Sequence, residues 1–163
     1  MVAHLTLPRI VAAALGLVAV LFALGWATRE DPAQKPYLTI LGGGFIANYR
    51  VADFYYGFTA DVTRPLPTGS IIEVRYDDPA GTGRYVERKR VGTDTERYSF
   101  RSPPLTGVEA GKPYAIDIHV YDREKTRELW THRLTYVSQI GSDIVPDAPL
   151  TVGPGYARNP DLR

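Results

Sequence analysis

The chain opens with one long apolar run, and everything after it is polar, tyrosine-rich and broken by turns. From Ile10 to Ala27, eighteen residues pass without a charge. As a helix this run would be about 27 Å long, close to the roughly 30 Å thickness of a hydrocarbon core. Charged residues flank both ends, and Trp26 sits where an interfacial aromatic residue is expected. The pattern predicts a transmembrane helix over residues 10–28, after a short tail of residues 1–9.

A cleaved signal peptide is the alternative interpretation of the same run. The small residues Gly25 and Ala27 would suit cleavage after Ala27. Signal sequences usually hold about 7–15 apolar residues, and because this run is longer we favour an uncleaved anchor. A short tail before a single apolar segment is typical of a signal-anchor, which carries the following part across the membrane. We therefore expect a single-pass inner-membrane protein, with a linker at 29–36 and a periplasmic C-terminal domain.

Residues 37–140 alternate short apolar or aromatic segments with turn residues. The turns are rich in Gly, Pro and Asp, most clearly over residues 77–83. Short, regularly spaced strands of this kind predict an all-β domain, an antiparallel β-sandwich of about seven strands. The expected strand segments are 37–41, 45–62 (one bent strand or two), 71–76, 85–91, 96–101, 114–121 and 129–137.

The last two segments can be paired residue by residue. Alternation predicts an apolar face on each strand, and pairing Val120 with Trp130 joins the two faces in one core layer. The same register sets Asp117 opposite Arg133 on the other face, an opposite-charge pair. The remaining apolar-face pairs are then Ile118 with His132 and Ile116 with Leu134.

The segment that leads into this hairpin is Val108-Glu109-Ala110-Gly111-Lys112-Pro113-Tyr114. It resembles the tyrosine-corner approach of fibronectin type III domains, in which a corner tyrosine bonds backbone a few residues upstream. Tyr114 matches the corner tyrosine, Gly111 the turn glycine and Val108 the apolar position, while Ala110 stands where a proline is usual. The resemblance implies a type III or immunoglobulin-like sandwich and carries no function.

Motifs for catalysis or metal binding are not found in the sequence. There is no Gly-x-Ser-x-Gly, no His-Glu-x-x-His and no cysteine, and His119 and His132 alternate onto opposite faces. The glycines at 42–44 lack a following helix and a Lys-Ser/Thr pair, so they predict a turn or bulge rather than a phosphate loop. The net charge of +1 gives no indication of nucleic acid. We therefore expect no enzyme activity, cofactor, metal or nucleic-acid partner.

Two stretches are open to both a packing and a binding interpretation. In the aromatic cluster at 54–58, alternation predicts Phe54, Tyr56 and Phe58 in the core and Tyr55 outside. The basic stretch at 84–90 could face anionic headgroups, where each basic residue is worth about 1 kcal/mol. We favour an edge strand protected by charge against aggregation, because the stretch is isolated and interrupted by Glu87.

Two segments are candidates for contact with a partner. In the apolar run, small residues recur at spacings of four, three and four, a pattern of helices that pack closely in membranes. Residues 141–163 combine four prolines with apolar residues, which predicts an extended Pro/Gly-rich arm laid on the domain or on a partner. The candidate residues are Ala12, Gly16, Ala19 and Ala23 in the run, and Ile144, Val145, Leu150, Val152 and Tyr156 in the arm.

These features favour a membrane-anchored extracytoplasmic accessory or scaffolding subunit that acts through protein–protein interaction. Its partner would be another membrane protein, contacted by the transmembrane helix and the arm. The alternative hypothesis is an extracytoplasmic module that binds a glycan or peptide. Such a module could also be secreted after cleavage of the signal peptide. An enzyme would have only scattered Asp, Glu and His residues to work with.

Overall fold

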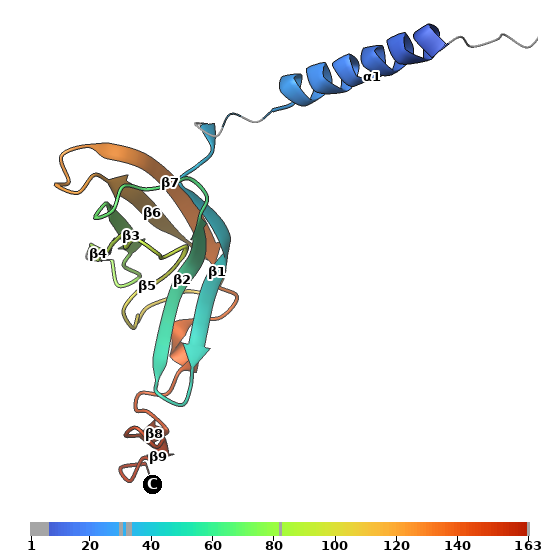
Figure 1. Ribbon diagram of the computed structural model, residues 1–163. Coiled ribbons are helices and arrows are strands. Elements are labelled where there is room, and N and C mark those ends of the chain that lie inside the picture. Colours follow the sequence, from blue (N-terminus) through green and yellow to red (C-terminus); the bar gives the residue numbers. More distant parts are fainter. Residues whose placement is uncertain (1–6, 30, 32–33, 82, 163) are drawn as a thin grey trace, which may run out of the picture. The chain divides into compact units, whose positions relative to one another are not determined.

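The computed structural model describes residues 7–29, 31, 34–81 and 83–162 (Figure 1). They divide between Lys35 and Pro36 into two compact units. In the first unit, the helix α1 (Leu7–Ala27) has no buried side chain and is long and apolar enough to cross a membrane. It begins three residues earlier than expected, because proline at position 8 is tolerated in the first turn of a helix. Thr28 caps the other end, where its hydroxyl donates to the Leu24 carbonyl at 2.8 Å.

The second unit is built from antiparallel sheets (Figure 1). The smaller main sheet has the order β1-β2-β5, and the larger has the order β4-β3-β6-β7. The strands of the first are β1 (Leu38–Asn48), β2 (Asp53–Val62) and β5 (Arg97–Arg101). Those of the second are β3 (Ile71–Asp77), β4 (Arg84–Arg90), β6 (Pro113–Tyr121) and β7 (Glu128–Val137).

Alternate residues of both sheets point into one buried cluster. Phe54, Tyr56 and Phe58 of β2 lie in it, as predicted, while Tyr55 points outward. Tyr56 joins the two sheets, because its ring meets that of Tyr76 on β3 edge-on at 5.4 Å. The hydroxyl of Tyr56 lies 3.0 and 3.1 Å from two backbone carbonyls, and burial raises its pKa. A core of this kind gains from aromatic area while the Tyr56 hydroxyl keeps hydrogen-bond partners.

The β6–β7 pairing confirms the predicted register. Val120 lies opposite Trp130, and Asp117 lies opposite Arg133 on the outer face. The expected core face on β7 is only partly covered, however, because β7 is an edge strand. Trp130 is half-buried, and His132 is exposed and stacks on it with ring centroids 5.5 Å apart.

The glycines at 42–44 lie within β1 at a bulge, where the pairing with β2 shifts between Ile40 and Gly42. A side chain on Gly43 would collide with the Tyr136 hydroxyl of β7 and the Gly57 carbonyl. Glycine at this position therefore leaves room for the Tyr136 side chain of β7, an edge strand of the other main sheet. The turn residues that follow Asp77 connect β3 to β4, and among them the Asp78 carboxylate accepts a hydrogen bond from the Ala80 backbone N–H at 2.9 Å.

The C-terminal segment departs from the predicted extended arm. It holds a short 3-10 helix (Ser142–Ile144) and a small ribbon of β8 (Thr151–Val152) and β9 (Ala157–Arg158). Regular structure is compatible with its prolines because none of the four lies at a paired ribbon position. The segment is bonded to its own domain at two places. Ser142 and Val108 exchange hydrogen bonds of 3.0 Å, and the Thr151 backbone N–H donates to the Arg50 carbonyl at 3.0 Å.

Candidate interaction surfaces

Tyr114, Gly111 and Trp130, which the sequence analysis singled out, stabilise the fold of the domain. Tyr114 is buried, and its hydroxyl accepts a hydrogen bond of 2.9 Å from the Glu109 backbone N–H. Gly111 adopts φ +78°, a left-handed conformation that favours glycine, and donates to the Ser138 carbonyl at 2.8 Å. Trp130 covers the rim of the core. These contacts fix the corner between the loop at 105–112 and β6.

The small residues of α1 line one side of the helix. At 100° per residue, Ala12, Gly16, Ala19 and Ala23 fall within an arc of about 60°. Nothing lies within 4 Å of the position that a side chain on Gly16 would take. At the C-terminal end, the Trp26 ring stacks with the Phe22 ring. The Arg29 guanidinium lies over the Trp26 ring, 6.0 Å from the ring centroid. This aromatic and cationic pair is of the type that marks a membrane interface.

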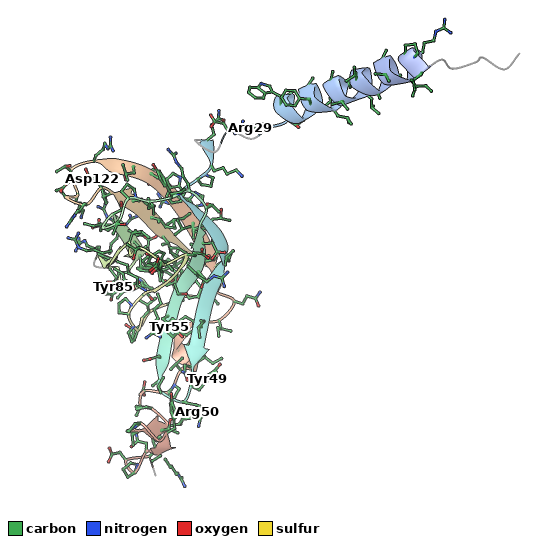
Figure 2. All side chains as sticks on the ribbon, viewed as in Figure 1. Arg29, Tyr49, Arg50, Tyr55, Tyr85 and Asp122 are labelled. Carbon is green, nitrogen blue, oxygen red and sulfur yellow. The ribbon has the colours of Figure 1, made fainter. Side chains whose placement is uncertain are left out.

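The apolar residues singled out in the arm do not form one surface. Val145 packs against the core cluster, whereas Ile144, Leu150 and Val152 are exposed by 46, 44 and 37%. Tyr156 is exposed as well, and the guanidinium of Arg50 lies 5.2 Å from its ring centroid; Figure 2 shows Arg50 at the junction of the β1–β2 turn and the arm.

A cleft of about 910 Å³ opens where the arm meets the loop at 105–110. Phe54, Leu105 and Val108 contribute its apolar part, and carboxylates from both the loop and the arm contribute its polar part. The cleft therefore combines an apolar floor with an acidic rim.

A second hollow lies on the outer face of the three-stranded sheet. Gly44 and Gly57 pair across β1 and β2, so this part of the face has no side chains. Leu41 and Ile46, each about half exposed, stand around the hollow, which has a volume of about 590 Å³. Tyr55 borders it and carries the Arg101 guanidinium 5.3 Å from its ring centroid.

The outer face of the four-stranded sheet holds a charge cluster, of which the sequence predicts only the pair of Asp117 with Arg133. Its centre is Glu73 on β3, whose side chain is 1% exposed. Arg75 donates to it from Nε and Nη2 at 3.0 and 2.8 Å, and Arg88 and Lys125 bind its other carboxylate oxygen. Burial by itself would raise the pKa of Glu73, but the bonds from Lys125, Arg88 and Arg75 outweigh it and lower the pKa to about 2.

A second group of ion pairs continues the cluster along the same face. Arg84 binds both Asp77, at 3.2 Å, and Asp117. Arg133 approaches Asp117 from β7 at 3.5 Å, and His119 contacts Glu128 across the β6–β7 pair. The signal that could have found this cluster is the outward alternation of charged residues on the segments at 71–77 and 113–121, read together with the basic stretch at 84–90. Within the described part of the chain, no three His, Asp or Glu side chains are placed to hold a metal ion.

Comparison with known proteins does not assign a function to any of these surfaces. No family model and no curated protein matches the chain. Among solved structures, it is similar to the crystal structure of wild-type OgpA from Akkermansia muciniphila, with a TM-score of 0.38 and 12% identity. The match covers 63% of this chain and 28% of that one. A likeness at this level does not assign a family.

Proposed function

We propose that this protein is a membrane-anchored accessory or scaffolding subunit of a bacterial inner membrane, with a periplasmic domain that acts through protein–protein contacts. The observation that carries the proposal is α1. From Ile10 to Ala27 its side chains are apolar, and none of them is buried within the chain. Exposing a face of this size to water costs about 25 cal/mol for every Å² of apolar surface, so a bilayer is its natural environment.

We propose further that the domain is an immunoglobulin-like sandwich of the fibronectin type III kind. Two observations support this assignment. The fourth strand, β4, pairs with β3, which divides the strands into three and four; in immunoglobulin constant domains the fourth strand joins the first sheet instead. The hydrogen bond from Glu109 to the Tyr114 hydroxyl is the kind of contact that a tyrosine corner makes. Such sandwiches host many functions, so the fold itself does not name the partner.

The partner contact is assigned to the small-residue side of α1, with the exposed apolar residues of the arm as a second contact. Small residues let two helix backbones approach closely in a bilayer, where packing rather than the hydrophobic effect drives association.

A ligand-binding module for a peptide is the second candidate function. The observation that favours it is the hollow beside Gly44 and Gly57, where the bare sheet lets an extended backbone approach.

The anchor is tested by N-terminal sequencing of the mature protein from the membrane fraction. We expect a chain that begins before Ile10 and stays in the membrane after an alkaline wash; a chain that begins at Thr28 would overturn the anchor.

Helix packing is tested by cross-linking through introduced cysteines, which is possible because the chain has no cysteine of its own. A cysteine in place of Gly16 should cross-link to the partner, and a matched cysteine in place of Val18, about 200° around the helix, should not. Equal cross-linking of both would argue against the small-residue side.

A further inference from the structure

We infer that the outer face of the four-stranded sheet binds anionic phospholipid headgroups. The inference rests on the proposed membrane location and adds a surface and a ligand class to it. We call this surface the basic face. Its cationic residues come from β3, β4, β7 and the β6–β7 loop and are Arg75, Arg84, Arg88, Arg90, Arg133 and Lys125.

Charges on the basic face are arranged in two layers. Two of the four carboxylates lie against the sheet, with Glu73 at 1% and Asp117 at 18% side-chain exposure, whereas Asp77 and Glu128 are 33% and 44% exposed. Their cationic partners lie outside them, with Arg88 at 56% and Arg133 at 63%. Over Glu73 and Asp117, an approaching surface therefore meets guanidinium groups before it meets carboxylates.

The face also has a surplus of positive charge. Its six cationic side chains are opposed by four carboxylates, those of Glu73, Asp77, Asp117 and Glu128, which leaves two positive charges in excess. The whole chain carries a net charge of only +1, so the remainder of the molecule is slightly acidic. This separation of charge gives the domain one side on which an anionic surface is favoured.

The chemistry of the exposed groups suits phosphate. A guanidinium has five N–H donors, and Arg88 uses only Nε for Glu73 while Arg90 uses Nη1 for two backbone carbonyls. The ion pair with Glu73 holds Arg88 in place, and the bonds to the Gly69 and Arg123 carbonyls hold Arg90, so less conformational entropy is lost when a second oxyanion binds. The face is thus a set of ordered arginines with donors still available to phosphate oxygens.

Chain connectivity favours a lipid surface over a soluble acidic partner. Residues 28–35 separate the end of α1 from the start of the domain unit at Pro36. Eight residues span at most about 29 Å when fully extended. Headgroups are then always within reach of the domain, at an effective concentration that a free acidic protein would not match. Under these conditions each basic residue near an anionic surface contributes about fivefold in affinity.

The test uses residues 36–163 alone, because the buried cluster and the sheets lie entirely within this unit. The domain is sedimented with vesicles of neutral phosphatidylcholine and with vesicles in which part of that lipid is replaced by phosphatidylglycerol. We expect binding to the anionic vesicles only, and loss of binding as salt is raised. Equal binding to both vesicles, or binding to neither, would overturn the inference. Binding to poly-glutamate but not to vesicles would assign the face to an acidic protein instead.

Two double variants locate the site. Arg90→Gln with Arg133→Gln removes two charges from the basic face without removing a partner of Glu73, and should weaken vesicle binding about 30-fold. Arg97→Gln with Arg101→Gln makes the same change of charge on β5, in the other main sheet, and should leave binding nearly unchanged. Equal losses from both would show that net charge acts rather than this face. Because the domain is used without α1, these results do not depend on whether the anchor is retained.

Discussion

The carboxylate of Glu73 offers a direct measurement of the buried ionic layer. Replacing it with Gln keeps the shape of the side chain but removes the charge that Arg75, Arg88 and Lys125 share. Breaking a buried ion pair costs about 3–5 kcal/mol when the remaining charge stays buried. Here the three cations are 38, 56 and 35% exposed and can be hydrated. We therefore expect Glu73→Gln to lower the free energy of unfolding by a smaller amount, about 2–3 kcal/mol near neutral pH.

The pKa of the same group predicts how this difference changes with pH. Folding lowers the pKa of Glu73 from 4.5 to about 2. At 1.36 kcal/mol per pKa unit, this difference corresponds to about 3–4 kcal/mol, slightly above the value of about 2–3 kcal/mol expected for exposed cations. Because the folded pKa lies below the unfolded one, the stabilisation is complete above the unfolded pKa and is lost as the pH falls from 4.5 towards 2.

Urea unfolding of residues 36–163, followed by circular dichroism, measures both effects. Urea is preferred because guanidinium chloride is a salt and would screen the ion pairs. The gap between the wild-type domain and Glu73→Gln should be largest near neutral pH and close as the pH approaches 2. Asp61→Asn is the matched control, since Asp61 pairs with Arg97 at 2.6 Å on an exposed face, and it should change stability little. A gap that does not change with pH, or that is no larger than the control, would refute the reasoning.

Two more changes test the corner and the arm in the same urea assay. Tyr114→Phe removes the acceptor of the Glu109 backbone N–H and should cost about 0.5–1.5 kcal/mol; unchanged stability would show that the corner bond contributes nothing. Ending the chain after Ile140 removes the hydrogen bonds between Ser142 and Val108 and the Val145 side chain, and should cost about 1.5–3 kcal/mol. If stability persists and a partner is lost from co-purification, the arm acts in trans.

Strand alternation predicts much of this fold because one face of each main sheet is buried. The register of β6 with β7 follows from the need to put Trp130 and Leu134 on the same face as Val120 and Ile116, since a shift of one residue would turn these β7 side chains to the other face. The same reasoning places Tyr55 outside the core. Strand alternation overestimates how deeply the inward-facing side chains of β7 are buried. Alternation predicts on which face of the sheet a residue lies, but not whether the opposite sheet extends over that residue. His132 is exposed for that reason.

Proline content alone does not predict the structure of the C-terminal segment. Four prolines forbid a long helix, yet they permit a single 3-10 turn and a two-residue ribbon. What fixes the segment is its contact with residues far away in the sequence, Val108 and Arg50. Contacts of this kind depend on tertiary structure, so composition predicts only that the segment is neither helix nor free linker.

The burial of Glu73 is the clearest case of a site that composition conceals. Alternation puts Glu73 on the outer face of β3, where a charged residue is usually solvated. It is covered because arginine and lysine side chains are longer than glutamate and aspartate, so when both kinds share a sheet face the cations reach over the carboxylates. The basic stretch at 84–90 predicts a charge-protected edge strand, because its charges are isolated in the sequence. In the structure, Arg84 and Arg88 of this stretch lie over acids from β3 and β6. A nearly neutral chain can therefore present a cationic surface when most acids on that face come from central strands and most bases come from edge strands and loops.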